Sequence, residues 1–242
     1  MGEMMATNTS SAASSDNASA LSQPTTEPRT ARGRKTRERL LTAARIVFET
    51  KGFLDTRVSD ICGEASLAQG TFYIYFQTKE DIFYNLVDSV VADRYLLTSV
   101  PDDFDGTVAD RFAYTLRQYF IEVQRAKKFS RIVEQVATFD EHMRESRMKI
   151  RREFSRRIQH GIERLQRQSA ADQDISAELT AEAIVAMINN FAYINLVLGE
   201  RDDLDIDQVV STLTNIWARS IALDVEKATA NEANRTFNTK AN

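Results

Sequence analysis

The 242-residue chain has a formal net charge of -4 and one cysteine, Cys62. A chain of this length can form one large domain or two modest ones and bury a core without disulfides or metals. A lone cysteine excludes an intrachain disulfide. No charged leader followed by an apolar segment, and no long uncharged apolar run, argues for export or membrane insertion. We therefore expect a cytoplasmic protein with no membrane partner.

Charge is unevenly distributed along the sequence. Between positions 29 and 57, nine Lys and Arg residues stand against three Asp and Glu residues, a local balance of +6, so the rest of the chain carries -10. Basic side chains that neutralise phosphates supply most of the affinity of proteins for nucleic acid. The asymmetry predicts a small module that attracts a polyanion, followed by a larger acidic body that stays soluble.

Helix breakers are concentrated at the start of the chain. Residues 1–30 are dominated by Ser, Ala, Thr and Asn, a composition with too little apolar area to offset the entropy of ordering. We expect a disordered arm there. After Pro28 the only proline is Pro101, and glycines are sparse, so helical periodicity continues over long stretches. The predicted fold class is all-α.

Capping residues and apolar spacing define the expected helices. Gly52 ends the first helix in a left-handed conformation, and Phe53 folds back on it. Thr56 is the expected N-cap of a short helix. Thr78, with Asp81 three residues later, is expected to cap a longer helix in the manner of a capping box. Together these signals predict helices at 35–51, 58–65, 69–76, from 78 onward, and at 105–127, 129–138, 140–168, 177–199 and 205–226, followed by a flexible tail, 227–242.

The two short helices need support from their neighbours. Two such helices joined by a tight turn form a poor core unless a longer helix braces them on each side, and the expected order of helices provides both braces. The exposed face of the second short helix can then enter the major groove of DNA. The sequence predicts a three-helix helix-turn-helix DNA-binding domain at 31–78 and a second helical domain at 79–226.

A dense motif occupies this region. It comprises Asp60-Ile61, the turn through Ala65 and Leu67, the run Gly70-Thr71-Phe72-Tyr73-Ile74-Tyr75-Phe76 and Thr78-Lys79-Glu80, and it extends back through Ala43-Ala44, Phe48 and Gly52. The segment from Arg57 to Phe83 thereby resembles the N-terminal signature of the TetR family of bacterial transcriptional regulators. Ser66 and Ala68 stand where the family commonly has glycine and serine. The resemblance implies a homodimer that binds operator DNA and senses a small molecule in its C-terminal domain.

The resemblance also implies DNA contacts. Gln69, Gly70 and Thr71 lie at the head of the expected recognition helix, and an amide such as that of Gln69 can pair bidentately with adenine N6 and N7. Phosphate contacts are expected from the other matching positions, which are Thr56, Arg57, Ser59, Tyr73, Tyr75 and Lys79. The basic residues just before the first helix either enter the minor groove or form a solvated tail; these are Arg32, Arg34 and Lys35.

The C-terminal half contains an unusual helix. Residues 181–198 are apolar nearly all round, so this helix must be covered on more than one side. The TetR resemblance implies that the last two long helices form the dimer interface as a four-helix bundle, although both could instead be intrachain core. The predicted interface residues are Ile188, Phe191, Val210, Leu213 and Trp217.

Aromatic and amide side chains supply candidates for a ligand site. Asn189 and Tyr193 share a helix face and need partners if buried, whether in a ligand or in each other and a neighbouring backbone. The remaining predicted ligand contacts are Tyr119, Phe120, Phe139 and Phe154, which could equally be plain core. The arginines of the 140–168 helix alternate with glutamates, which favours a solvated, salt-bridged face over a site for an acidic ligand.

The usual enzyme signatures are missing, and we predict no catalytic residue, cofactor or metal site. His142 among charged neighbours is typical of a solvated face, and Cys62 is typical of a small core residue. The function predicted is that of a ligand-responsive repressor. Its expected partners are double-stranded operator DNA, a small-molecule effector of unknown identity and a second copy of the chain. The alternatives are a constitutive DNA-binding protein and, less favoured, an all-α enzyme.

Overall fold

The computed structural model describes residues 28, 30–97, 100–101, 103–201 and 203–229. Nearly all of the predicted N-terminal arm, and the tail beyond residue 229, lie outside this part. The described residues form helices and connecting loops with no strand, which confirms the all-α prediction. The elements are α1 (Ala31–Asp55), α2 (Val58–Glu64), α3 (Gln69–Tyr75), α4 (Lys79–Leu97), α5 (Val108–Arg125), α6 (Lys127–Val136), α7 (Glu141–Arg167), α8 (Ala177–Ala192), the π-helix η1 (Tyr193–Val197) and α9 (Ile206–Ser220).

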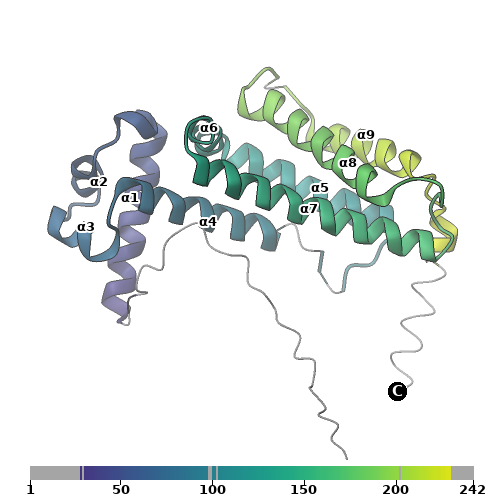
Figure 1. Cartoon of the computed structure of the whole chain (residues 1–242), viewed down its shortest axis with the longest axis horizontal. Helices are drawn as coiled ribbons and strands as arrows, with labels where there is room; N and C mark the ends of the chain where they lie inside the picture. Colours follow the sequence, from purple (N-terminus) through teal and green to yellow (C-terminus); the bar gives the residue numbers. More distant parts are fainter. Residues whose placement is uncertain (1–27, 29, 98–99, 102, 202, 230–242) are drawn as a thin grey trace, which may run out of the picture.

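The molecule is elongated, with a small module at one end of a long helical bundle (Figure 1). Helices α1, α2 and α3 form the module, and α4 runs from it toward the bundle. Within the bundle α7 packs against α8 and α5 packs against α9, while α6 packs against α1 and η1. Helix α6 therefore lies between the module and the bundle and contacts both.

Helix α1 starts earlier and ends later than predicted. The Thr30 hydroxyl accepts a hydrogen bond from the Gly33 N–H at 3.1 Å and caps the first turn. Gly52 takes the predicted positive φ, 78°, but its ψ of 170° makes a kink, after which the helix continues to Asp55. Phe53 is buried beyond the kink and stacks on Phe48 with ring centroids 5.7 Å apart. The predicted return of Phe53 onto its own helix is thus confirmed.

The prediction that Thr56 caps α2 is wrong. Thr56 is buried, and its hydroxyl donates to the Gly52 carbonyl oxygen at 2.6 Å, so it closes the kink at the end of α1. The N-cap of α2 is Arg57, whose backbone N–H donates to Asp60 Oδ2 at 3.0 Å. Burial and this internal hydrogen bond also withdraw Thr56 from any contact with DNA. A single threonine preceding a helix gave no way to distinguish a cap from a bond to the helix behind it.

Polar residues fix the turn into α4 as predicted. The Asp81 N–H donates to the Thr78 hydroxyl at 3.1 Å, and Asp81 Oδ2 accepts from the Gln77 N–H at 3.0 Å. The reciprocal bond thus reaches one residue further back than in a standard capping box. In the turn between α2 and α3, Ser66 has a φ of 49°. This left-handed conformation is the one that glycine adopts without strain.

Two hydrophobic cores divide the chain, and the division does not fall at the predicted boundary after residue 78. The first core combines α1–α4 with α6 and with Met143 at the start of α7, and it includes the buried Cys62. The second core combines α5, the C-terminal half of α7, α8, η1 and α9. Helices α4 and α6 therefore share a packed interior with the helix-turn-helix module, although both follow it in the sequence.

The last helices carry two departures from the predicted pattern. The expected helix at 177–199 changes to a π-helix at Tyr193, and α9 ends at Ser220 rather than at 226. A helical turn at 225–229 follows, in which Ala228 is buried, so residues 227–229 belong to the packed body and not to a flexible tail. The segment Ala177–Val197 is long and apolar enough to cross a membrane by composition. It packs against α7 and α9 as a core helix.

Candidate functional site

Helix α3 presents a free face opposite a buried one. Phe72 is fully buried and attaches the helix to the first core. On the other side Gln69 and Gly70 are exposed at the helix start, and Tyr73 and Ile74 are 56% and 75% exposed. A helix held from within and bare on its outer face has the geometry of a helix that reads the DNA major groove.

The prediction for this surface missed Ile74. An isoleucine in a run of apolar residues looks like a core residue, but its neighbours Phe72 and Phe76 occupy the inward positions. A large apolar side chain left 75% exposed on a recognition helix is suited to contact a thymine methyl group. The spacing of the two phenylalanines, four residues apart on one face, was the signal that excludes Ile74 from that face.

The first turn of α1 lies beside α3. Gly33 is buried, and a Cβ at this position would lie 2.8 Å from Pro28 Cβ and 3.6 Å from the Tyr75 hydroxyl oxygen. Only a residue without a side chain allows this approach. The predicted minor-groove residues flank Gly33 and are exposed, but they are helical and not part of an extended arm; these are Arg32, Arg34 and Lys35.

The charges on this turn are electrostatically unusual. The first turn of α1 contains no acidic residue, whereas the positive end of the helix dipole favours anions and disfavours cations. A cluster of cations at this place costs some helix stability, which a nearby polyanion would offset. We call these cations, together with the half-buried Tyr75 and the exposed Arg57 and Ser59, the basic and hydroxyl-bearing border of α3.

The structure contradicts the predicted phosphate contact of Lys79. Its Nζ donates to the carbonyl oxygens of Phe53, Leu54 and Thr56 at 2.9, 3.1 and 3.1 Å, and it lies 4.8 Å from the centre of the Phe53 ring. An ammonium group has three donors, and all three are used. Lys79 therefore binds α4 to the kinked end of α1. A lysine just inside a helix start offered no sequence signal for this internal role.

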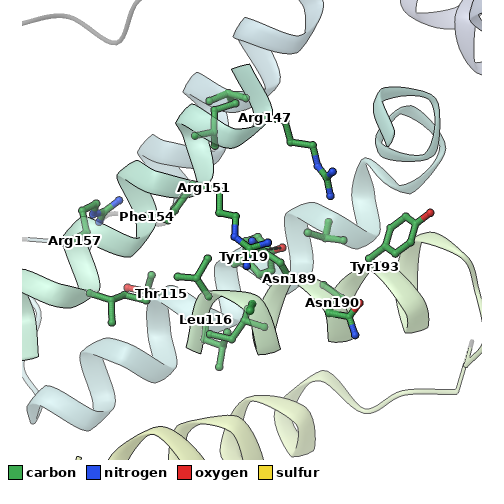
Figure 2. A pocket seen from close by; sticks show the side chains of 18 of the residues that line it. Thr115, Leu116, Tyr119, Arg147, Arg151, Phe154, Arg157, Asn189, Asn190 and Tyr193 are labelled. Carbon is green, nitrogen blue, oxygen red and sulfur yellow. Dashed lines mark hydrogen bonds between the residues drawn. The ribbon is translucent and has the colours of Figure 1, made fainter. Parts of the chain in front are cut away.

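A cavity of about 550 Å³ opens in the helical body (Figure 2). Its wall is formed by residues of α4, α5, α6, α7, α8, η1 and α9. Tyr119, Phe154, Asn189 and Tyr193 line it. The Tyr119 hydroxyl donates to Asn189 Oδ1 at 2.9 Å, so the amide oxygen has a partner on α5. The volume lies within the usual ~300–1,000 Å³ of small-molecule sites.

Two predicted ligand residues do not reach the cavity. Phe120 is fully buried behind the wall, where its ring packs edge-on against Phe191 at 6.0 Å between centroids. Phe139 is 52% exposed in the loop between α6 and α7, with its ring 6.3 Å from that of Phe53. Both predictions are wrong. Phe120 follows the lining residue Tyr119 directly and therefore points to another side of α5. Phe139 lies beyond the end of α6, after the last residue of its apolar stripe.

Arginines line the cavity, which the sequence argument did not favour. Arg147, Arg151 and Arg157 all belong to its wall. Arg144 on the same helix does pair with Glu141 at 2.8 Å, as expected of a solvated face. Arg147, however, pairs with Glu134 of α6 at 2.8 Å. The four-residue spacing of Arg147 and Arg151 places them on one side of α7, and the sequence did not show which side faces a cavity.

Most of the predicted dimer residues lie inside the protomer. Val210, Leu213 and Trp217 of α9 and Ile188 of α8 are buried in the second core, and only Phe191 is partly exposed. Trp217 stacks on Phe112 of the same chain, with ring centroids 4.2 Å apart and planes inclined by 8°. These four side chains leave little surface for a second copy to contact. Their burial favours the alternative interpretation, intrachain core.

These features define the class of the protein: an all-helical helix-turn-helix protein with a cavity in its larger domain. Residues 40–86 match the family model described as "Bacterial regulatory proteins, tetR family". This part of the chain is therefore similar to the DNA-binding part of TetR-family transcriptional regulators. The family consists of transcriptional regulators and not of enzymes.

Relatives match over most of the chain. The HTH-type transcriptional regulator YdgC of Bacillus subtilis is 26% identical over 188 residues, which cover 75% of this chain and 92% of YdgC. The regulator EthR of Mycolicibacterium smegmatis is 24% identical over 193 residues, covering 75% and 84% of the two chains. Among solved structures, the complex of SmeT with triclosan has the same fold, with a TM-score of 0.62, 18% identity and coverage of 77% of this chain and 91% of SmeT.

Proposed function

We propose that this chain is a ligand-responsive repressor: a cytoplasmic homodimer that binds operator DNA through α3 and the border around it, and releases the DNA when a small molecule occupies the cavity. The observation that carries the proposal is the composition of the cavity wall. Two of the helices that form it, α4 and α6, are also packed into the core of the helix-turn-helix module. A related structure that holds triclosan supports a small-molecule site in this fold.

Helix α4 connects the two regions along its length. At its N-terminal end Phe83 is fully buried and contacts Phe48 edge-on at 5.2 Å and Phe53 at 4.8 Å between ring centroids. One turn further along, Val87 lines the cavity, as do Val90 and Val91. A ligand that displaces these valines tilts a helix whose other end is fixed in the DNA-binding module.

Helix α6 provides a second connection. Phe129 lines the cavity, lies 5.6 Å from Phe83 between ring centroids, and carries the Arg45 guanidinium of α1 above its ring at 5.7 Å. Two residues later, Arg131 donates to the carbonyl oxygen of Val197 at 2.6 Å and to that of Leu198 at 3.1 Å. Helix α6 thus joins the end of η1, another wall of the cavity, to the helices that hold α3.

A second copy of the chain is needed because a short recognition helix gains operator affinity by binding two half-sites about 34–36 Å apart, or a multiple of that spacing. With the predicted residues buried, the surface for dimerisation is the outer face of α8, η1 and α9. Several apolar residues of these helices, and Leu198 directly after η1, are exposed: Leu179, Ala183, Ile194, Leu198 and Ile216. An isologous contact of two such faces buries both.

The energetics required are modest. An effector needs only to bind the arrangement that is unable to hold DNA more tightly than the one that holds it. A coupling free energy of about 1–3 kcal/mol lowers operator affinity roughly 5- to 150-fold. The wall shared between the cavity and the first core supplies contacts that differ between the two arrangements.

A genomic-fragment selection with the purified full-length chain tests the DNA-binding part. Fragments enriched by the wild type and not by a Gln69→Ala, Tyr73→Ala double variant support it, because both side chains are on the exposed face of α3. Equal enrichment by the two proteins would refute it. The selected fragment then reports release by a panel of apolar and amphiphilic small molecules. Operator affinity that ignores molecules shown to occupy the cavity would instead identify a constitutive DNA-binding protein.

A further inference from the structure

The cavity is long and mostly apolar. Residues from Met143 to Leu165 of α7 line it, which at 1.5 Å per residue corresponds to about 33 Å of helix. Valines of α4, Phe112 and Leu116 of α5, and Ile188 of α8 supply apolar surface on the other sides. Such a wall selects an extended apolar body and gains affinity for each methylene group that it removes from water.

The charge of the wall is strongly unbalanced. Among the described residues that line the cavity, the only carboxylate is that of Glu134, and the cationic residues are Arg111, Arg147, Arg151, Arg157 and Arg164. Glu134 is engaged by Arg147 at 2.8 Å. The wall therefore keeps a formal charge of +4. An apolar cavity of low dielectric constant strengthens the field of such charges and favours a bound anion.

Two of these arginines have unused donors. Arg111 donates through Nη2 to the Phe104 carbonyl oxygen at 3.0 Å, but its buried Nε has no hydrogen-bond partner within the described part of the chain. Arg151 is half-buried and makes no hydrogen bond or ion pair with any described residue. Figure 2 shows its side chain extending from α7 into the cavity toward Tyr119 and Asn189. A guanidinium partly removed from water without a counter-charge is costly, and an anion relieves that cost.

We infer that the effector is an anionic amphiphile, with one carboxylate or phosphate headgroup held by Arg151 and an extended apolar body lying along α7. The inference rests on the proposed function only in taking this cavity as the effector site. The guanidinium fork matches both headgroups because each offers two oxygens in a plane to its N–H donors. The same wall binds a neutral alcohol of equal length less tightly and repels an amine.

Binding is measurable without DNA because Trp217 lines the cavity and is the only tryptophan of the chain. Its fluorescence is titrated with dodecanoate, dodecyl phosphate, dodecanol and dodecylamine, each below its micellar concentration, and calorimetry confirms the affinities. A twelve-carbon probe occupies roughly 400 Å³ at about 30 Å³ per heavy atom, within the 550 Å³ available. We expect both anions to bind at least 10-fold more tightly than the alcohol, and the amine not to bind. The comparison of the two anions shows which headgroup is preferred.

Arg151→Met removes the charge and keeps most of the side-chain length. Its matched control is Arg152→Met on the exposed, outward side of the same helix, which does not line the cavity. We expect Arg151→Met to weaken the anions 10- to 100-fold and leave the alcohol unchanged, and Arg152→Met to change neither. Circular dichroism verifies that both variants are folded. Equal affinity of the wild type for anion and alcohol, or unchanged anion binding by Arg151→Met, would overturn the inference.

The failure of this inference is distinguishable from a failure of the proposed function. If no probe binds while the selected operator fragment is still bound, the ligand class is wrong and the DNA-binding role stands. If the anions bind through Arg151 but do not release the fragment, the ligand class is right and the cavity does not control DNA binding.

Discussion

Adjacent residues of α9 allow a sharp test of the proposed dimer surface. Ile216 is 44% exposed on the outer face of the helix, whereas Trp217 is 4% exposed and stacks on Phe112. We compare Ile216→Glu with Trp217→Glu, because the same charge is introduced at adjacent positions, one exposed and one buried, on one helix. The first change affects association between copies, and the second affects folding of the protomer.

The expected magnitudes differ widely. Truncating a buried Trp costs about 3–5 kcal/mol, loss of an aromatic stack costs about 0.5–1.5 kcal/mol more, and an unpaired buried carboxylate adds several kcal/mol. The total for Trp217→Glu approaches the whole unfolding free energy of a typical protein, about 5–15 kcal/mol. Within one protomer, Ile216→Glu changes stability by only about ±0.5 kcal/mol. In an isologous dimer it places two carboxylates in an apolar contact.

Analytical ultracentrifugation and circular dichroism separate the two effects. Ile216→Glu should sediment as a helical monomer and bind single half-sites weakly, while Trp217→Glu should lose its cooperative thermal transition. Leu54→Glu is the control, since Leu54 is an apolar side chain 62% exposed on α1, away from the proposed surface. It should remain dimeric. An Ile216→Glu protein that sediments as a dimer at the wild-type concentration would remove the outer face of α9 from the interface.

Four further predictions concern the DNA-binding module. Gln69→Ala should weaken binding to the cognate DNA site by about 1–3 kcal/mol and relax the preference at one base pair. Lys79→Met should lower the unfolding free energy by about 1–3 kcal/mol and leave the salt dependence of operator affinity unchanged. A weaker dependence of operator affinity on salt would restore Lys79 as a phosphate contact. Ser66→Gly should raise the melting temperature, since glycine adopts the observed φ of 49° without strain; a lower melting temperature would show that the turn is unstrained. The hydrogen bond from Lys51 holds the pKa of Asp60 below its ordinary value of 3.8, so this carboxylate stabilises the fold above that pH, and the contribution is lost as the pH falls through the lowered pKa. Between pH 6 and 2.5, the melting temperature of Asp60→Asn should therefore fall less with acidification than that of the wild type. Parallel curves for the two proteins would refute this role of Asp60.

Helix positions and caps were largely predictable from the sequence because they depend on local chemistry. Thr78 with Asp81 marked the start of α4, and Gly52 marked the break near the end of α1. Apolar periodicity also identified the stripe of α9 that contains Val210 and Leu213. The partner of that stripe was not predictable. A stripe packs equally well on its own chain or on a second copy, and only the placement of α5 beside α9 decides between them.

Side chains with two physical characters account for most of the errors at the site. Lys79 has a long apolar stem and a charged head, so it bridges a helix end internally as readily as it contacts a phosphate. Arg151 belongs to a helix face that looks solvated, yet it extends into a cavity formed by helices far away in the sequence. Cavities arise from gaps between elements, so no periodicity within one helix reveals which of its faces borders one.

The interactions at the N-terminal end of α4 explain why a tilt of this helix would reach α3. Lys79 binds three carbonyl groups at the kinked end of α1. Asn85, further along α4, accepts a hydrogen bond from Arg37 of α1. Between these two links the Phe83 ring is packed against aromatic rings of α1. Polar bonds on two sides of a close-packed interior leave little freedom for α4 to slide independently. In the proposed mechanism the helix and the module move as one body, so that a displacement of the cavity valines would rotate the recognition helix relative to that of the second copy.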